Sequence, residues 1–91
     1  MADLEAAHAY LHERNPEAAR RFAIAVLEAA ERLQIFPKLG PVARDLRPPG
    51  RYRSWIYSHY RLVYRIEDDV IWVLRVWDSR RDPDALTVEE S

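Results

Sequence analysis

The feature that most constrains this chain is a pair of β-rich runs in its second half. The runs "YRLVYRIE" (residues 60–67) and "VIWVLRVW" (residues 70–77) are rich in β-branched and aromatic residues, and a short acidic turn separates them. This pattern predicts an antiparallel hairpin. An earlier run, "RYRSWIY" (residues 51–57), follows the turn signal "RPPG" and is expected to pair with the first run across "SHY". The second half of the chain therefore predicts an antiparallel meander of strands.

The first third of the chain predicts two helices. In residues 2–14, apolar side chains recur at helical spacing: Leu4, Ala7, Tyr10 and Leu11. Asn15 is a good N-cap and Pro16 suits the first helical position, so a second helix is predicted from Pro16 to about Gln34. Its apolar face, which requires a sheet or a helix against it, comprises Ala19, Phe22, Ala23, Val26, Leu27, Ala30 and Leu33. Helices followed by strands predict an α+β fold, with both helices packed on one face of a small antiparallel sheet.

Length and composition limit the class of protein. The chain has 91 residues, which suits a single domain spanning residues 1–91. The absence of cysteine excludes disulfides and thiolate metal sites and favours a reducing, cytoplasmic compartment. No apolar run approaches membrane-spanning length, and the start "MADLEAAHAY" lacks the basic and apolar segments of a secretory signal. A cytoplasmic protein without a membrane partner is therefore expected.

The charge distribution is uneven, although the formal net charge is only −1. Residues 44–65 contain a single acid, Asp45, and seven arginine or histidine residues: Arg44, Arg47, Arg51, Arg53, His59, Arg61 and Arg65. Arginine offers a planar fork for phosphate or carboxylate, so this basic segment indicates a surface for a large anionic or macromolecular target. The alternative is that a GC-rich genome favours arginine codons whatever the function of the residue. We attribute about half of these side chains to that cause.

Strict alternation along the last strand divides its side chains between two faces. One set is expected to point into the core: Val70, Trp72, Leu74 and Val76. The other set mixes one cation with apolar groups: Ile71, Val73, Arg75 and Trp77. In the middle strand, one side is shared by Arg61, Val63 and Arg65. We therefore expect one face of the sheet to display arginine, and Trp55 and Trp77 to stay exposed until a partner covers them.

Three segments together resemble a known family: "ADLEAAHAYLHERNPEAARRF", "AAERLQIFPKLG" and "YRLVYRIEDDVIWVLRVWDSRRDP". Their order and spacing are similar to those of the RelE/ParE superfamily of bacterial toxins from type II toxin–antitoxin systems. The resemblance implies two helices on a twisted antiparallel sheet, and a co-expressed antitoxin that holds the toxin inactive in a hetero-oligomer. It also implies one of two targets. RelE-like members cleave messenger RNA on the ribosome, whereas ParE-like members are generally not nucleases and poison DNA gyrase.

Two features depart from the family pattern. Members normally begin with a β-strand before the first helix, whereas this sequence opens almost directly at that helix. Three explanations of the missing strand are open: a misplaced start codon, a segment boundary and a real deletion. A missing strand would leave one sheet edge unpaired and open to strand addition by another chain. At Asp78, many nuclease-type relatives carry histidine, which weakens the nuclease interpretation. We therefore expect a ParE-like inhibitor of DNA gyrase. The alternatives are a RelE-like messenger RNA endonuclease and a degenerate toxin that only binds partners.

Residues for RNA cleavage can nevertheless be nominated. Cleavage at a 2′-hydroxyl needs a base, an acid and cations for the phosphate. The cation candidates are Arg53, Arg61, Arg75 and Arg81. Asp78 is the candidate base. A proton could come from Tyr60, Tyr64 or His59, although packed rings are the favoured interpretation of both tyrosines.

The remaining candidates concern partners and metals. The residues expected to contact an antitoxin are Arg20, Arg21, Trp55 and Trp77, together with the surface of the second helix. His8 and His12 lie one helical turn apart, but no third ligand accompanies them, so no metal site is predicted. The sequence has no Gly-rich phosphate loop and no nucleophile–base pair. No cofactor is therefore expected, and a toxin without enzymatic activity is favoured.

Overall fold

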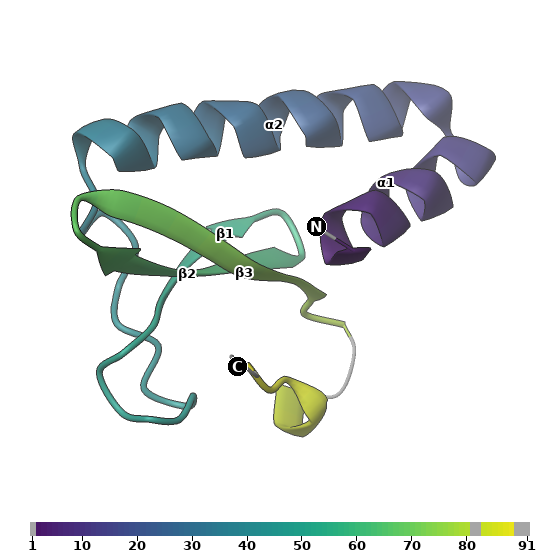
Figure 1. Cartoon of the computed structure of the whole chain (residues 1–91). Helices are drawn as coiled ribbons and strands as arrows, with labels where there is room; N and C mark the ends of the chain where they lie inside the picture. The colour runs from purple at the N-terminus through teal and green to yellow at the C-terminus, as the bar shows by residue number, and fades with distance from the viewer. Residues whose placement is uncertain (1, 81–82, 89–91) are drawn as a thin grey trace.

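Two helices and three strands form two layers in the computed structural model, which describes residues 2–80 and 83–88 (Figure 1). In chain order the elements are α1 (Ala2–Arg14), α2 (Pro16–Ile35), β1 (Arg53–Tyr57), β2 (Tyr60–Glu67), β3 (Val70–Asp78) and the short 3₁₀ helix η1 (Pro83–Ala85). The strands pair antiparallel in the order β1-β2-β3. Both helices lie on one side of the sheet, whereas η1 and much of the loop between α2 and β1 lie on the other (Figure 1). The predicted α+β fold is confirmed.

Local sequence signals set both ends of α2. The Asn15 backbone is extended, and its Oδ1 accepts a hydrogen bond from the Ala18 N–H at 3.2 Å. Pro16 occupies the first turn, where no intrahelical hydrogen bond is lost. At the other end, Phe36 leaves helical geometry because Pro37 follows it. Within the described residues, neither helix combines the length and the apolar character needed to span a bilayer.

The first hydrophobic core lies between the helices and the sheet. Its buried members are Phe22, Leu33, Tyr60, Leu62, Tyr64 and Val76. The rings of Phe22 and Tyr60 are in contact, with centroids 4.6 Å apart. Phe22 and Leu33 come from the predicted apolar face of α2 and pack on the sheet as expected. Leu27, predicted to lie on the same face, is 65% exposed, so its assignment to that face is wrong.

A second hydrophobic core covers the face of the sheet that the sequence predicts to be open. Its buried members are Ala43, Leu46, Tyr52, Val63, Trp77 and Leu86. Leu46 comes from the loop between α2 and β1, and Leu86 follows η1, so segments from two parts of the chain fold over this face. Trp77 is only 4% exposed. The prediction that Trp77 stays exposed until a partner arrives is therefore wrong.

A two-residue turn joins β2 to β3. Asp68 and Asp69 adopt positive φ angles of 52° and 62°, as a type I′ turn requires and as aspartate tolerates. Glu67 of β2 is paired with Val70 of β3 directly across this turn. This first pair sets which residues of the two strands are paired further along the hairpin.

A β-bulge interrupts β3 beyond this turn. Val63 of β2 pairs with Arg75, whereas the next residue, Tyr64, pairs with Val73. Leu74 is therefore an extra residue without a partner across the ladder.

The bulge changes which residues of β3 share a face. Val76 lies in the first core, beneath the helices, as predicted. Ile71 and Val73 pack against the same core, although they were predicted to lie on the opposite face. Val70 and Trp72 lie on the opposite face and are 47% and 49% exposed. The prediction that these two residues join the core is wrong, because it assumed an unbroken period of two across Leu74.

The hydroxyl of Tyr64 fastens the loop after α2 to the centre of the sheet. Tyr64 is fully buried, and its hydroxyl accepts a hydrogen bond from the Gly40 N–H at 3.0 Å and donates one to the Pro37 carbonyl at 2.7 Å. Burial raises the pKa of this hydroxyl, which keeps its proton. Gly40 has no room for a side chain, since a Cβ there would lie 2.5 Å from the Ser54 carbonyl oxygen. Tyr64 is therefore a packed ring with a bonded hydroxyl, as expected.

Replacing Tyr64 with phenylalanine should lower the free energy of unfolding by about 1–3 kcal/mol, because a buried N–H and a part-buried carbonyl lose their partner. Urea unfolding followed by tryptophan fluorescence measures the change. Tyr57→Phe is the matched control: Tyr57 is exposed, and losing its hydroxyl should change stability by no more than about 0.5 kcal/mol. Equal stabilities of the two variants would contradict the role assigned to Tyr64.

Candidate functional site

The arginines on the sheet face opposite the helices are not displayed as predicted. The side chains of Arg61, Arg65 and Arg75 are only 16%, 15% and 27% exposed. Each forms an ion pair with a carboxylate, and the partners are, in that order, Asp45, Glu67 and Asp3. The expectation of an uncovered cationic face is therefore wrong, because carboxylates and the second core cover it.

Two of these ion pairs hold the guanidinium in one orientation. Arg61 donates two hydrogen bonds to the carboxylate oxygens of Asp45, at 2.8 and 2.7 Å. They lower the pKa of Asp45. Arg75 donates from Nε to the Asp3 carboxylate at 2.5 Å and from a terminal nitrogen to the Thr87 carbonyl at 2.7 Å. Charge-assisted contacts of this kind are strong, so a phosphate would have to share each guanidinium with a carboxylate that already orients it.

The other cation candidates lie elsewhere. Arg53 donates from one terminal nitrogen to the Gly40 carbonyl at 2.8 Å and to the Lys38 carbonyl at 3.3 Å. It therefore supports the loop after α2. Arg81 lies outside the described residues. The structure does not bring the three described cation candidates together at one point.

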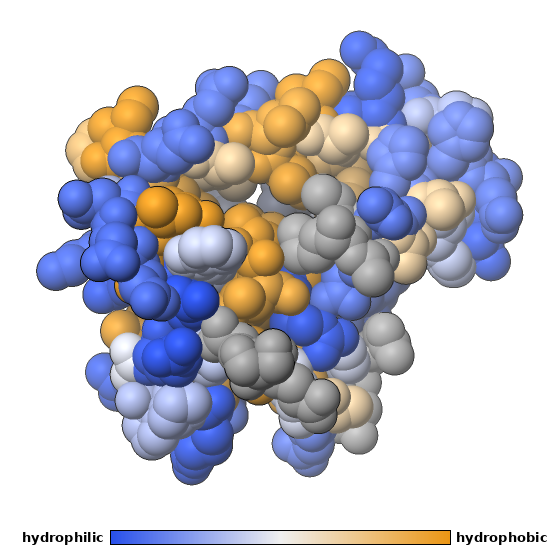
Figure 2. All heavy atoms as spheres, in the orientation of Figure 1, coloured by the Kyte–Doolittle hydropathy of each residue, from blue (hydrophilic) through white to orange (hydrophobic). Residues whose placement is uncertain are grey.

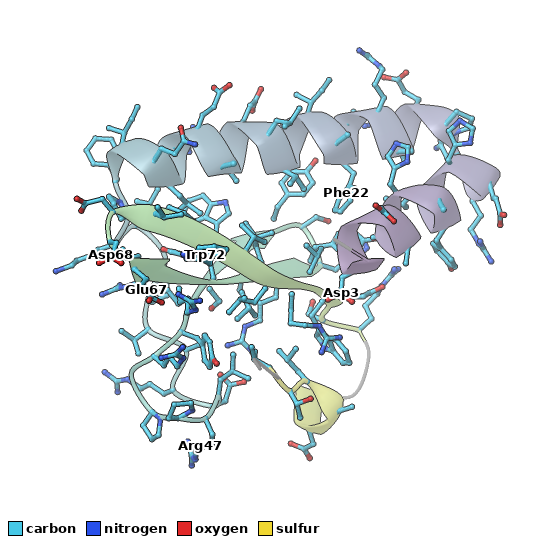
Figure 3. All side chains as sticks on the ribbon, viewed as in Figure 1. Asp3, Phe22, Arg47, Glu67, Asp68 and Trp72 are labelled. Carbon is cyan, nitrogen blue, oxygen red and sulfur yellow. The ribbon has the colours of Figure 1, made fainter. Side chains whose placement is uncertain are left out.

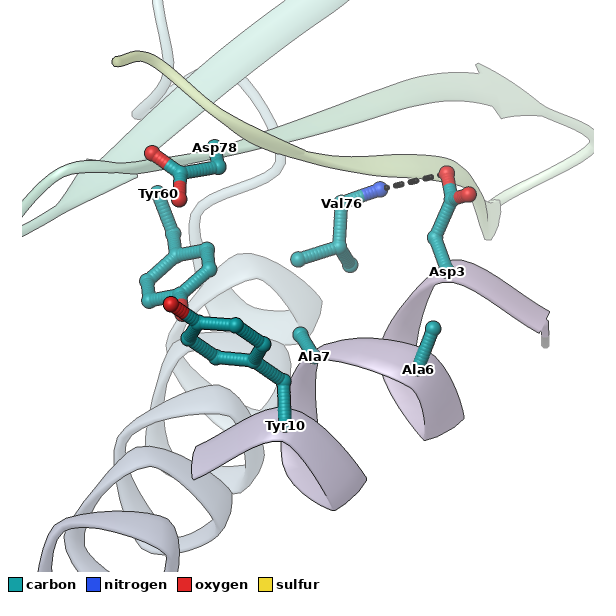
Figure 4. Close-up of a pocket in the computed structure, with 7 residues that line it drawn as sticks. All are labelled: Asp3, Ala6, Ala7, Tyr10, Tyr60, Val76 and Asp78. Atoms are coloured by element: carbon teal, nitrogen blue, oxygen red, sulfur yellow. Dashed lines mark hydrogen bonds between the residues drawn. The ribbon is translucent and has the colours of Figure 1, made fainter. Parts of the chain in front are cut away.

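A hollow of about 370 Å³ lies between α1 and the end of β3 (Figure 4). It is lined by Asp3, Ala6, Ala7, Tyr10, Tyr60, Val76 and Asp78. The register pairs Tyr60 with Asp78, so the candidate base and one candidate proton donor are neighbours. The ring of His59 contacts that of Tyr60, with centroids 4.5 Å apart. Three of the residues nominated from the sequence therefore meet at this end of the sheet.

The pKa shifts of Asp78 and Tyr60 move both groups further from neutrality, which does not suit acid–base catalysis at neutral pH. Arg80 donates to both carboxylate oxygens of Asp78, from Nε at 3.0 Å and from a terminal nitrogen at 2.7 Å. These hydrogen bonds lower the pKa of Asp78 to about 2, so the carboxylate is a very weak base. Burial, and then the charge of Asp78, raises the pKa of Tyr60, which keeps its proton.

The histidines do not form a metal site. His8 and His12 stack along the exposed side of α1, with ring centroids 6.0 Å apart. His59 lies in the turn between β1 and β2, where Nδ1 is 3.3 Å from the Ser58 hydroxyl and Nε2 is buried without a hydrogen-bond partner among the described residues. Across residues 2–80 and 83–88, no three His, Cys, Asp or Glu side chains gather closely enough to hold a metal ion.

The predicted partner-binding residues divide between exposed and covered positions. Arg20 and Arg21 are exposed on α2, where Arg20 pairs with Glu17 at 2.9 Å. Trp55 is half-buried against the first core, so only part of its ring can meet a partner. Trp77 belongs to the second core and offers almost no surface.

Trp72 is a surface residue that the alternation along the last strand did not predict. Figure 2 shows apolar side chains gathered over β3. Trp72, labelled in Figure 3, belongs to this strand. The guanidinium of Arg65 lies 5.2 Å from the Trp72 ring centroid. In the hairpin, Arg65 of β2 is paired with Trp72 of β3, two residues from the pair that flanks the turn. Because residues paired across a ladder share a face, the charge of Arg65 was the signal that could have placed Trp72 correctly.

The outer edge of β3 has no neighbouring strand among the described residues. At one end of this edge, the Val76 N–H donates to the Asp3 carboxylate at 3.1 Å (Figure 4). Nearer the turn, the alternation of the antiparallel ladder directs the backbone groups of Ile71 and Val73 outward. These groups, beside the exposed Trp72, can pair with an added strand.

Comparison with known proteins identifies a family match over most of the chain. The family model for the ParE toxin of the type II toxin–antitoxin system, parDE, matches residues 1–83. No curated protein matches the sequence.

Arg80→Ala should raise the pKa of Asp78 from about 2 toward its ordinary value of 3.8, because the guanidinium bonds are the main cause of the shift. Since the folded-state pKa is the lower one, the stabilisation from this pair is complete above about pH 4 and is lost as the pH falls toward 2. NMR titration of the side-chain carboxyl carbon measures the pKa. Arg20→Ala, which removes an exposed arginine from α2, is the control. A pKa that stays near 2 without Arg80 would mean that another group holds the carboxylate.

Proposed function

This chain belongs to the ParE toxin family of type II toxin–antitoxin systems, and we propose that it acts by binding DNA gyrase rather than by cleaving messenger RNA. The observation that carries the proposal is the ion pair of Asp78 with Arg80, which lowers the pKa of the candidate base to about 2. A carboxylate with that pKa removes a proton from a ribose hydroxyl far less readily than a base that titrates near neutrality. Binding a large target needs no such group.

The positions of the cations support the same proposal. A ribonuclease needs positive groups aimed at one scissile phosphate. Instead, Arg61 binds Asp45 with both terminal nitrogens. Arg75 binds Asp3 and a backbone carbonyl, and Arg53 binds two loop carbonyls. A phosphate that bound any of them would have to share the guanidinium with partners that already orient it.

A RelE-like, ribosome-dependent endonuclease is the second candidate function. It is favoured by one observation: His59, Tyr60 and Asp78 meet at one end of the sheet. In that mechanism Arg81, which follows Arg80 in the sequence, would supply a cation. A degenerate toxin that only binds its partners would keep the same fold and have neither activity.

The cognate antitoxin that the family implies is proposed to cover the outer edge of β3. The backbone groups of Ile71 and Val73 would bond an extended antitoxin segment, and Val70 and Trp72 would contact its side chains. Such a hetero-oligomer would combine main-chain hydrogen bonds with apolar contacts. Further contacts are proposed for Arg20, Arg21 and the exposed part of Trp55.

Two assays on the purified chain separate the candidate functions. A gyrase inhibitor should block the supercoiling of relaxed plasmid DNA and leave messenger RNA intact in a reconstituted translation reaction. An endonuclease should cleave the messenger RNA and leave supercoiling unaffected, and Asp78→Asn should then abolish cleavage. A folded chain that binds its antitoxin and affects neither reaction would contradict gyrase inhibition and support the degenerate toxin.

Trp72→Ser should weaken binding of the cognate antitoxin by about 10-fold or more, because a half-exposed tryptophan beside an open strand edge is a typical interface anchor. Ile56→Ser is the matched control. Ile56 is exposed on β1, at the opposite edge of the sheet, and its loss should change the affinity by no more than about twofold. Isothermal titration calorimetry measures both affinities. Equal losses in the two variants, or no loss in either, would rule out the β3 edge as the contact.

A further inference from the structure

The face of α2 that points away from the sheet carries exposed apolar and charged side chains. α2 is the outermost layer of the molecule, and side chains project from it away from the sheet (Figure 1, Figure 3). Ile24 and Leu27, one helical turn apart near the middle of this helix, are 42% and 65% exposed. Neither residue belongs to the two hydrophobic cores of the described residues. We name the following exposed residues the α2 outer face: Glu17, Arg20, Arg21, Ile24, Leu27, Glu28, Glu31 and Arg32.

The charges of the α2 outer face are arranged antisymmetrically about Ile24 and Leu27. Before this apolar pair, the face presents one acid and then two arginines. After the pair, it presents two acids and then one arginine. Reading the face backwards therefore gives the opposite charge at nearly the same spacing from the apolar pair. Such a surface is complementary to itself, as an interface between two identical chains around a two-fold axis requires.

An antiparallel pair of α2 helices brings the opposite charges together. With the two-fold axis midway between Ile24 and Leu27, Ile24 of one copy faces Leu27 of the other. The same register places three arginines opposite acids: Arg20 opposite Glu31, Arg21 opposite Glu28 and Arg32 opposite Glu17. A parallel pair would instead place arginine opposite arginine and acid opposite acid. Because like charges that face each other weaken an interface, the pattern selects the antiparallel arrangement.

Contacts within one helix do not account for this pattern. Arg20 does pair with Glu17 of its own helix, with a terminal nitrogen 2.9 Å from the carboxylate. Both side chains of this pair are more than half exposed, so the contact is weak and each partner can also meet a charge on another chain. Arg21 and Glu28 are about two helical turns apart, a spacing at which side chains of one helix do not meet. Their opposite charges are therefore complementary only between two chains.

We propose that the α2 outer face binds a second copy of this chain, so that the free toxin forms a dimer with two-fold symmetry. Ile24 and Leu27 of both copies form the apolar centre of the interface, and the arginine–acid pairs surround it. The occupant is a second copy rather than an unrelated protein because the face is complementary to itself. The antitoxin is proposed to contact Arg20 and Arg21 as well. The second copy and the antitoxin therefore compete, and the dimer is a property of the chain without its antitoxin.

Sedimentation velocity over a range of protein concentrations measures the dimer in the purified chain. Its dissociation constant should rise with salt concentration, because exposed ion pairs are screened. Leu27→Ser should raise the dissociation constant about 10-fold or more, since every dimer contains the residue twice. Ile56→Ser is the matched control: Ile56 is 64% exposed on β1, and its loss should change the constant by no more than about twofold. Circular dichroism establishes that both variants are folded.

A pair of charge reversals tests the register without removing an apolar contact. Arg21→Glu alone and Glu28→Arg alone each place like charges opposite each other in a dimer of that variant. Each should raise the dissociation constant about 10-fold or more. When the two variants are mixed, the new acid of one copy faces the new arginine of the other, and the unaltered Glu28 and Arg21 also face each other. The mixture should therefore form a heterodimer about as stable as the dimer of the unmodified chain.

The matched control for this rescue is Glu13→Arg, which makes the same change of charge at an exposed position on α1. It should bind fluorescently labelled Arg21→Glu more weakly than Glu28→Arg does, because it leaves an acid opposite the new acid. A rescue specific to Glu28→Arg cannot come from net charge or from contacts within one helix.

Three results would overturn the proposal. One is a chain that sediments as a monomer at every concentration at which it stays soluble. Another is a dimer that Trp72→Ser disrupts and Leu27→Ser does not, which would place the second copy on the outer edge of β3. The third is a mixture of the Arg21→Glu and Glu28→Arg variants that associates no better than either variant alone. These measurements contain neither gyrase nor antitoxin, so their failure leaves both of those proposals to be decided by the supercoiling and calorimetry assays.

Discussion

The burial of β2 on both faces is the constraint on which the rest of the structure depends. Val63 and Tyr64 are adjacent, point to opposite faces of the sheet and are both fully buried. The two helices can cover only one of these faces. The long segment between α2 and β1 must therefore fold back over the other, and the Tyr64 hydroxyl links the start of that segment to the strand.

This burial divides the arginines into two groups. Arg61, Arg65 and Arg75 lie on β2 and β3, so their stems are covered by the second core and their charged ends pair with carboxylates. The arginines of residues 44–51 lie on the covering segment itself and keep their charged ends at the surface. A basic run that looks continuous in the sequence thus becomes a structural set and a surface set. The two sets therefore differ in how much of each side chain solvent can reach.

Local signals predicted most of the fold, and long-range contacts account for the rest. Asn15 and Pro16 correctly place the start of α2, because the hydrogen bonds that define a helix start span only a few residues. The burial of Trp77 could not be predicted in this way, since the segments that cover it have no periodic pattern. At the candidate site, Asp78 was identified from the sequence but its pairing with Arg80 was not. That pairing lowers the basicity of the carboxylate.

The bulge in β3 affects how the chain behaves when no partner is bound. Together with the Asp3 carboxylate at Val76, it confines the open part of the β3 edge to a short stretch near the turn, about residues 70–73. Long, flat, regular edges are the ones that template stacked cross-β assemblies. An edge this short can take up one strand but gives a growing fibril little to extend from. The same irregularity that shortens the edge proposed for the antitoxin therefore makes this edge of the sheet a poor template for aggregation.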